Sequence, residues 1–161
     1  SAMVARLGSF SSVDTRVTAE FSVDKVVPGQ YIVIHGRSVT DAYSVRLRVE
    51  PDASVRMWLL RGSSSAIGAS AVAPGVTITP GAKYTVSLEV TGTSPTTLRA
   101  KLWTSGSAEP DWQMMGANDV AEMQVAGAVA VESRVPGNAA GADQVPVVLS
   151  FHDITVIDPT P

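Results

Sequence analysis

The fold is decided by the stretch Val13-Asp14-Thr15-Arg16-Val17-Thr18-Ala19-Glu20-Phe21-Ser22-Val23. Within these eleven residues, apolar or small side chains occupy the odd positions and polar side chains occupy the even ones. Successive side chains of a β-strand point to opposite faces of the sheet, so this alternation predicts one long, half-buried strand. The same alternation recurs over residues 43–50, 84–90 and 98–103. The sequence therefore predicts an all-β protein.

Weaker segments extend the strand pattern to about ten or eleven strands. They are Val4–Leu7, Tyr31–Val39, Val55–Leu60, Ala66–Ala73, Gln113–Met115, Gly127–Val135 and Val147–Ile157. Only Asn118–Gln124 has a helical pattern, with Asn118 or Asp119 as the N-cap of one or two turns.

Pro-Gly pairs at 28–29, 74–75, 80–81 and 136–137 each predict a type II turn and a strand break, because proline followed by glycine supplies the required φ angles. The Gly- and Ala-rich segment Pro136–Gln144 predicts a loop.

Many antiparallel strands in 161 residues pack most economically as two sheets face to face, since a single sheet would leave one face and two edges uncovered. We therefore expect one domain, residues 1–161, folded as a two-sheet antiparallel β-sandwich of the jelly-roll kind with at most one short helix. Residues 1–3 are interpreted as a cloning remnant and residues 158–161 as the start of a linker to neighbouring domains.

Composition and charge exclude several classes of protein. The absence of cysteine excludes a disulfide framework, a thiolate nucleophile and a cysteine zinc site. No apolar run approaches the roughly 20 residues of a membrane helix, so we expect a soluble chain with no membrane insertion. The net charge is −3, whereas a nucleic-acid reader is usually strongly basic, so we expect no nucleic-acid partner.

The order of several segments resembles the concanavalin A-like (laminin-G-like) jelly-roll module. The segments are Tyr43–Val49 with Asp52 and Val55, Tyr84–Thr93, Leu98–Trp103, Ala108-Glu109-Pro110 with Trp112-Gln113, and Val148–Val156. Such modules resemble accessory domains of actinobacterial secreted and surface proteins and of phage tail proteins. The resemblance covers about residues 10–157 and implies a glycan- or surface-binding role outside the cell, at the cell surface or on a virion. It does not identify a ligand, because members differ in their binding loops.

Catalysis is disfavoured by the carboxylates. Some jelly-roll relatives are glycoside hydrolases with the pattern Glu-x-Asp-x-(x)-Glu on one strand, and the nearest string here is Glu109-Pro110-Asp111-Trp112-Gln113-Met114. Proline argues against a central strand, and glutamine or methionine occupies the last carboxylate position. Without a second carboxylate there is no acid/nucleophile pair, so we expect no enzyme, with a glycoside hydrolase or lyase as the alternative.

The polar register of the middle strands predicts one basic, aromatic face. If the alternating apolar residues point inward, nine residues point outward: His35, Arg37, Arg46, Arg48, Arg56, Trp58, Arg99, Lys101 and Trp103. Tryptophan rings stack on sugar C–H surfaces and arginine offers forked donors, so this face predicts a glycan ligand, and an anionic one in particular. The alternative is a merely solvated sheet face, and the predicted face exists only if these strands share a sheet.

Asp153 is the candidate metal ligand. In several concanavalin A-like relatives a carboxylate on the last strand helps to hold a structural Ca²⁺, so the resemblance implies calcium here, with no other cofactor required. The alternative is an ordinary hydrogen-bonding aspartate, since calcium takes six to eight oxygens. The alternation slips at Phe151-His152-Asp153-Ile154, which predicts a bulge.

These observations lead to one main hypothesis, a non-catalytic module that binds carbohydrate or a cell surface as part of a larger secreted, surface or phage-tail protein. The alternatives are an assembly or spacer domain without a glycan ligand, and a glycan-active enzyme.

Overall fold

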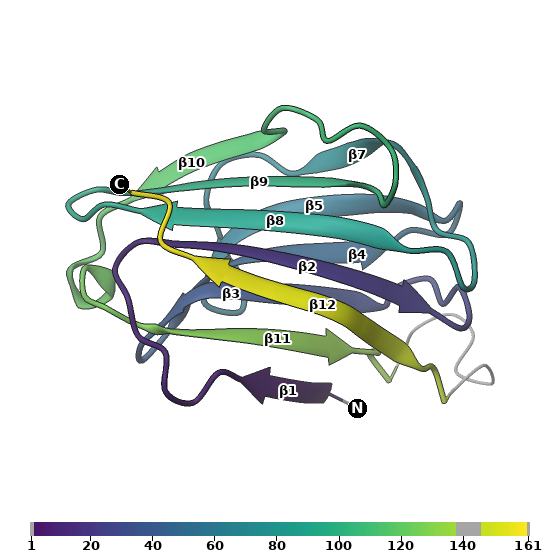
Figure 1. Cartoon of the computed structure of the whole chain (residues 1–161), viewed down its shortest axis with the longest axis horizontal. Coiled ribbons are helices and arrows are strands. Elements are labelled where there is room, and N and C mark those ends of the chain that lie inside the picture. The colour runs from purple at the N-terminus through teal and green to yellow at the C-terminus, as the bar shows by residue number, and fades with distance from the viewer. Residues whose placement is uncertain (1, 138–145, 161) are drawn as a thin grey trace.

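The chain forms two antiparallel β-sheets that pack face to face (Figure 1). The computed structural model describes residues 2–137 and 146–160. Its strands are β1 (Ala2–Arg6), β2 (Thr15–Val23), β3 (Tyr31–Ser38), β4 (Ala42–Val49), β5 (Ser54–Arg61), β6 (Ser65–Ala66), β7 (Ala71–Thr77), β8 (Tyr84–Thr91), β9 (Thr96–Thr104), β10 (Met114–Asn118), β11 (Ala128–Arg134) and β12 (Leu149–Ile157). The predicted all-β sandwich is confirmed.

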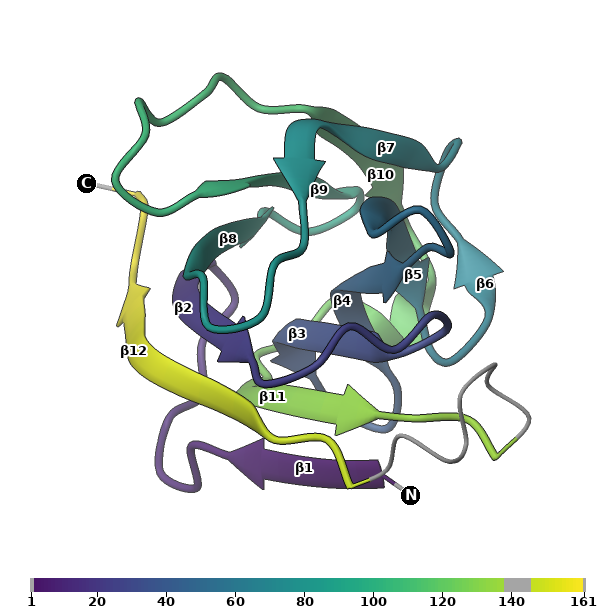
Figure 2. The same cartoon turned by 90° about the vertical axis from the view of Figure 1, so that its right-hand side faces the viewer.

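One sheet has seven strands in the order β1-β11-β3-β4-β5-β6, with β7 also paired to β5. The other has five strands in the order β10-β9-β8-β2-β12. Figure 2 looks along the sandwich and shows β8, β2 and β12 in one layer and β3, β4 and β5 in the other. Among the described residues, no helix has both the length and the apolar character needed to cross a membrane.

The core lies between the two sheets and is built by the inward positions of the alternating strands. In β2, residues 15, 17, 19, 21 and 23 are buried and the intervening residues are half-buried, as the opening stretch predicts. The strands β4, β5, β8 and β9 contribute their own inward rows, such as Val45 and Leu47 opposite Val86 and Leu88. This continuous apolar layer supplies most of the stabilising free energy.

The turn predictions are confirmed in part. Gly29 and Gly81 have φ angles of 89° and 79° between strands, as a type II turn requires. Pro74-Gly75 was predicted to break a strand, but it lies inside β7. It is tolerated because β7 pairs with β5 only at residues 71, 72 and 77, so Pro74 occupies an unpaired bulge of an outer strand. Residues 138–144 of the fourth predicted loop lie outside the described residues.

The predicted helix is shorter than expected. Only Ala121–Met123 is helical, as one 3-10 turn, and Val120 rather than Asn118 or Asp119 precedes it. Asn118 ends β10, and its Oδ1 accepts the Val120 N–H at 3.2 Å. Asn118, at the end of β10, therefore stabilises the 3-10 turn by accepting this hydrogen bond.

Arg37 is buried between the sheets, which corrects its predicted place on the outer face. A bulge between His35 and Arg37 shifts the register of β3, so Gly36 and Arg37 both turn inward. Gly36 has no room for a side chain, because a Cβ atom there would lie 2.7 Å from Cγ2 of Val90. The fully buried guanidinium of Arg37 lies 5.7 Å from the centre of the Tyr43 ring.

All of the hydrogen-bonding capacity of Arg37 is used inside the protein. Nε donates to the carbonyl oxygen of Val13 at 3.1 Å, and Nη2 donates to that same oxygen and to the Gly92 carbonyl at 2.9 Å. Nη1 donates to Thr96 Oγ1 at 2.7 Å and to the Met123 carbonyl at 3.2 Å. Burial lowers the pKa of Arg37, yet a guanidinium stays protonated in proteins, so these five bonds compensate a buried charge.

Candidate functional site

The outer face of the seven-stranded sheet carries three rows of side chains that run across the strands. Cross-strand pairing aligns them, because residues opposite one another point to the same face. One row is Val4, Glu132, Val33, Arg46 and Trp58, the next is Arg6, Ala130, His35, Ser44 and Leu60, and the third is Arg134, Tyr31, Arg48 and Arg56. Residues from β1, β11, β3, β4 and β5 thus meet on one surface.

A groove of about 300 Å³ follows these rows and continues to the connections after β3 and β5. We call it the outer groove. Its lining is Val4, Arg6, Tyr31, Val33, His35, Ser38, Val39, Thr40, Asp41, Ala42, Ser44, Arg46, Leu60, Gly62, Ser63, Ala130, Glu132 and Arg134. Of the nine predicted ligand-binding residues, His35 and Arg46 line it.

Three buried polar atoms among the lining residues have no hydrogen-bond partner in the described part of the chain. They are Nδ1 of His35, Oγ of Ser44 and Nε of Arg46. Ser44 is opposite His35 in the register of β3 and β4, and only 1% of its surface is exposed. Buried polar groups nearly always have a partner, so three unsatisfied groups beside one groove mark a place for a polar ligand or bound water.

The His35 ring is oriented by Glu132. Nε2 lies 3.2 Å from Oε2 of Glu132. Burial lowers the pKa of His35, and Glu132 opposes that effect only in part, so the ring is neutral at pH 7. A carboxylate only accepts hydrogen bonds, which places the proton on Nε2 and leaves Nδ1 as an acceptor. His35 can therefore accept an O–H from a ligand.

Arg46 lies between two aromatic rings. Its guanidinium carbon is 5.0 Å from the centre of the Tyr31 ring and 4.9 Å from the centre of the Trp58 ring. Nη1 donates to the Ser63 carbonyl at 3.3 Å. The rings hold the cation over the sheet, while this single long hydrogen bond leaves it able to shift at low cost.

Arg48, Arg56 and Trp58 lie on the same face but outside the outer groove. Glu50 makes ion pairs with Arg48 at 2.7 Å and with Arg56 at 3.5 Å, and its hydrogen bond raises the pKa of Arg48. The guanidinium carbon of Arg48 is 5.1 Å from the centre of the Trp58 ring. The Trp58 ring, which was predicted to stack on a sugar, therefore contacts the guanidinium groups of Arg46 and Arg48.

Arg99, Lys101 and Trp103 lie on the other sheet, so the prediction of one shared face is wrong. They belong to β9, which pairs with β8 and β10 in the five-stranded sheet. The reason is topological: after β7 the chain crosses to the second sheet, and alternation within β9 carries no information about that crossing.

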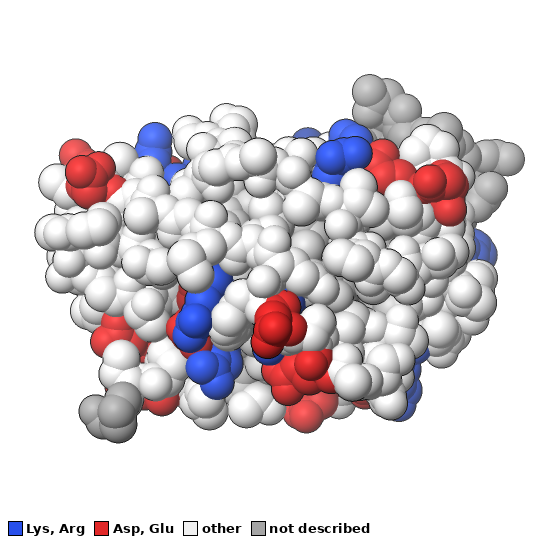
Figure 3. Space-filling model, turned by 90° about the horizontal axis from the view of Figure 1, so that it is seen from above, with Lys and Arg blue, Asp and Glu red and all other residues white. Residues whose placement is uncertain are grey.

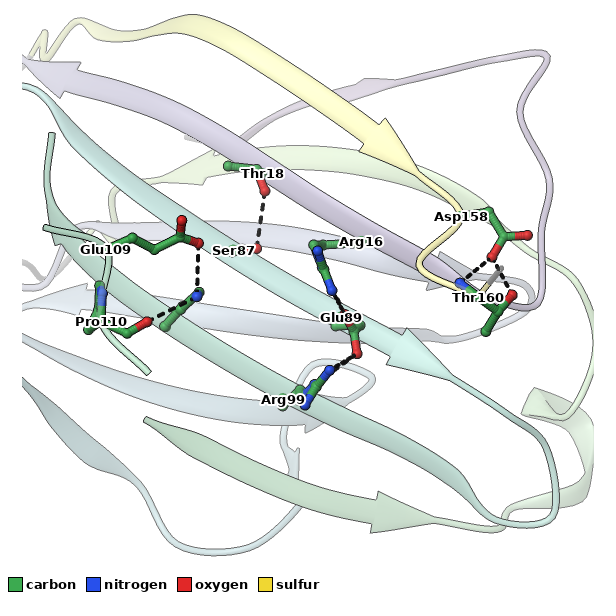
Figure 4. A network of polar contacts seen from close by, with 10 residues as sticks. Arg16, Thr18, Ser87, Glu89, Arg99, Glu109, Pro110, Asp158 and Thr160 are labelled. Atoms are coloured by element: carbon green, nitrogen blue, oxygen red, sulfur yellow. Dashed lines mark hydrogen bonds and ion pairs between the residues drawn. The ribbon is translucent and has the colours of Figure 1, made fainter. Parts of the chain in front are cut away.

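Charges on the five-stranded sheet are mutually compensated. Glu89 is 3% exposed and makes ion pairs with Arg16 and Arg99, both at 2.6 Å (Figure 4). Lys101 pairs with Glu109 at 2.8 Å and donates to the Pro110 carbonyl at 3.0 Å. In Figure 3, seen from the side of β9 and β10, basic and acidic groups lie next to one another in a largely uncharged surface.

Trp112 covers this network. Its ring centre lies 5.8 Å from the guanidinium carbon of Arg16, 4.6 Å from that of Arg99 and 4.6 Å from Nζ of Lys101. The segment that carries Glu109 and Trp112 precedes β10 and is not a strand, as its proline predicts. It therefore acts as a structural cover in which Glu109 neutralises a lysine.

The residues around Asp153 do not assemble a carboxylate-rich calcium site. The predicted bulge is confirmed between Phe151 and Asp153, and Asp153 is exposed opposite Glu20 of β2. Within residues 2–137 and 146–160, no three His, Asp or Glu side chains gather around a common point. Calcium binding at Asp153 stays a prediction.

The sequence missed Tyr31, Ser44, Glu132, Arg6 and Arg134 as groove residues. The signal was present for three of them. Alternation along 31–35 sends Tyr31 outward with His35, alternation along 43–49 sends Ser44 outward with Arg46, and alternation along 129–134 sends Glu132 outward. What the sequence lacks is the pairing of β11 and β1 beside β3, which brings the acidic and basic side chains to the groove.

Comparison with known proteins gives a fold. No protein-family model matches the chain, and no curated protein matches it. Solved structures do. The fold is a jelly-roll β-sandwich. The carbohydrate-binding module CBM66 from Bacillus subtilis aligns with 92% of this chain and 77% of its own, at 14% identity and a TM-score of 0.55.

Two further structures show how widely this fold is used. Scytalido-glutamic peptidase aligns with 91% of this chain and 76% of its own, at 12% identity and a TM-score of 0.53. A xylan β-1,4-xylosidase from Bacillus halodurans aligns with 90% of this chain but 28% of its own, at 11% identity and a TM-score of 0.51. A binding module, a peptidase and about a quarter of a xylosidase share the architecture, so function must be argued from the site.

Proposed function

We propose that this protein is a non-catalytic carbohydrate-binding module, an accessory domain of a larger secreted, surface or phage-tail protein, and that its ligand occupies the outer groove. The observation that carries the proposal is the set of unsatisfied groups on His35, Ser44 and Arg46. The likeness to a carbohydrate-binding module supports it at the level of fold.

The chemistry of the groove suits a sugar. A hydroxyl both donates and accepts, and the groove offers an acceptor on His35, a donor on Arg46 and a hydroxyl on Ser44 that can do either. Val33, Leu60 and Ala130 add apolar surface for the C–H side of a sugar ring. The three unsatisfied atoms are shielded from solvent, so binding requires a small shift of a neighbouring side chain, and the loosely held Arg46 can supply it.

The same geometry disfavours hydrolysis. The two groove carboxylates are engaged, Glu132 with His35 and Asp41 with Arg61 at 3.2 Å. A serine hydrolase needs a hydrogen bond from nucleophile to base, and Ser44 Oγ makes none within the described chain. Binding without turnover is the activity that these contacts favour.

The test is a thermal-shift and calorimetric screen of the purified protein against a panel of neutral and acidic polysaccharides. A ligand at one hundred times its dissociation constant adds about 2.7 kcal/mol of stability, or roughly 5–10 °C for a domain of this size. Ser44→Val, which removes the hydroxyl and fills the space with methyl groups, is expected to abolish the shift. Lys83→Ala, just before β8 and beside the other sheet, is the surface control.

Three outcomes would contradict the proposal. If no polysaccharide of the panel raises Tm or binds in calorimetry, and the protein is a symmetric dimer in solution, the assembly or spacer domain is favoured. Release of reducing ends from a polysaccharide favours the enzyme. A shift that survives Ser44→Val places the ligand outside the outer groove.

A further inference from the structure

The outer groove has more arginines than carboxylates among its lining residues. Among its lining residues, Arg6, Arg46 and Arg134 make no ion pair with any described residue. Its two carboxylates are each bound by another side chain, Glu132 by His35 and Asp41 by Arg61. The groove therefore presents three arginines outside any ion pair against one carboxylate, Glu132, whose hydrogen bond to the neutral His35 ring leaves its negative charge in place, so positive charge is in excess.

The three arginines come from separate strands and line the same groove. Arg6 of β1 and Arg134 of β11 are exposed beside the rows that contain Glu132 and His35, and Arg46 of β4 lies across from them. On the opposite sheet, by contrast, Glu89 and Glu109 compensate their basic neighbours.

We propose that the outer groove selects glycans that carry an oxyanion, either a uronate carboxylate or a sulfate ester, with Arg46 as its main partner and Arg6 and Arg134 at the rim. This inference rests on the proposed function and names the chemical class of its ligand. A guanidinium offers two parallel N–H donors to a carboxylate or sulfate, and the Nε edge of Arg46 is the edge without a partner.

Different groove residues bind different groups of one sugar residue, with Arg46 for the oxyanion and His35 and Ser44 for hydroxyls. The guanidinium of Arg46 lies close to the rings of Tyr31 and Trp58, which keep the cation over the sheet, and its Nε has no partner among the described residues. His35 and Ser44, in the adjacent row, remain for hydroxyls of the same residue. An acidic sugar satisfies both sets at once, whereas a neutral sugar leaves the arginines uncompensated.

The experiment compares matched pairs of polysaccharides by isothermal titration calorimetry. One pair is polygalacturonate and its carboxyl-reduced form, and the other is dextran sulfate and dextran, so the arms distinguish carboxylate from sulfate. We expect at least one anionic member to bind about tenfold or more tightly than its neutral counterpart, with affinity that falls as sodium chloride rises.

Variants locate the effect. Arg46→Gln is expected to remove most of the preference for the anion, and Arg134→Gln to reduce it by a smaller factor. The control is Lys83→Gln, which removes a positive charge just before β8, beside the opposite sheet, where Lys83 is half-exposed and its Nζ lies 3.8 Å from Oε1 of Glu20. It is expected to leave the preference unchanged.

Each result has a defined meaning. If the neutral member of each pair binds as tightly, or if only neutral glycans bind, the inference on charge is wrong while the carbohydrate-binding proposal stands. If Lys83→Gln weakens anion binding as much as Arg46→Gln does, the attraction is a general property of charge and the site assignment fails. If no glycan binds, both proposals fail together.

Discussion

Replacing Arg37 by methionine tests whether its buried guanidinium holds the sandwich together. Methionine fills a similar volume but leaves the carbonyl oxygens of Val13 and Met123 without their donors. Each unsatisfied buried acceptor costs about 1–3 kcal/mol, and water can replace the bond to the exposed Gly92 carbonyl. We therefore expect a loss of about 2–6 kcal/mol in the free energy of unfolding, which corresponds to a decrease in Tm of at least roughly 4 °C.

Two companion variants identify the cause. Arg37→Lys keeps the charge but replaces the planar fork by one nitrogen, so it is expected to recover less than half of the loss. Arg46→Met removes an arginine that has one long hydrogen bond, so it should cost about 1 kcal/mol or less. The measurement is unfolding by urea and by heat, followed by circular dichroism. If Arg37→Met and Arg46→Met unfold within about 2 °C of each other, the structural role assigned to Arg37 is refuted.

Three further predictions concern the packing, the charges and the pH dependence. Gly36→Ala should cost about 1–3 kcal/mol in urea unfolding because its methyl group would overlap Val90, whereas Gly8→Ala, with open space around it, should be near neutral; equal effects would contradict the close approach. Glu89→Ala should lower the free energy of unfolding by about 2–3 kcal/mol, because it removes the buried carboxylate that pairs with the partly exposed Arg16 and Arg99. A loss under about 0.5 kcal/mol would contradict a structural role for the network. Burial lowers the pKa of His35 below its unfolded value, so the unfolded chain binds the proton first, and stability present above about pH 6.5 should be lost as the pH falls toward the folded pKa. The difference in unfolding free energy between wild type and His35→Gln should therefore shrink or change sign as the pH is lowered from 8 to 5. A constant difference would contradict a lowered pKa of His35 in the folded state.

The strands could be predicted from sequence because each needs only its own alternation. Over residues 15–23 the alternation is correct for each side chain, although the strand begins two residues after Val13, and the slip beside Asp153 correctly indicates a bulge. The bulge beside Gly36 leaves no such mark, because unbroken alternation from Ile34 through Gly36 sends Arg37 outward. The placement of Arg37 therefore depends on how β3 meets β8, and local pattern cannot supply that.

Assembly of the candidate site was beyond the sequence for a related reason. His35 and Arg46 were predicted with the correct face, since β3 and β4 are neighbours in the chain and form a hairpin. Glu132 and Arg134 are about a hundred residues away from them and reach the groove only because β11 pairs with β3. Long-range pairing decides which charges meet, and no periodicity within a strand encodes it.

The two outer faces carry similar residues, yet their physical states differ. On the five-stranded sheet, Glu89 sits beneath its arginines and Trp112 covers them, so the charges are satisfied and the surface gains no free energy from binding an anion. On the seven-stranded sheet, Arg46 lies between aromatic rings with an unsatisfied Nε, and the rim arginines Arg6 and Arg134 make no ion pair with a described residue. A protein surface whose donors are already paired must break those bonds to bind a ligand, whereas unpaired donors require only ordering and the small side-chain shift that uncovers them. The difference in compensation, rather than the number of arginines or tryptophans, is therefore the reason to place the ligand in the outer groove.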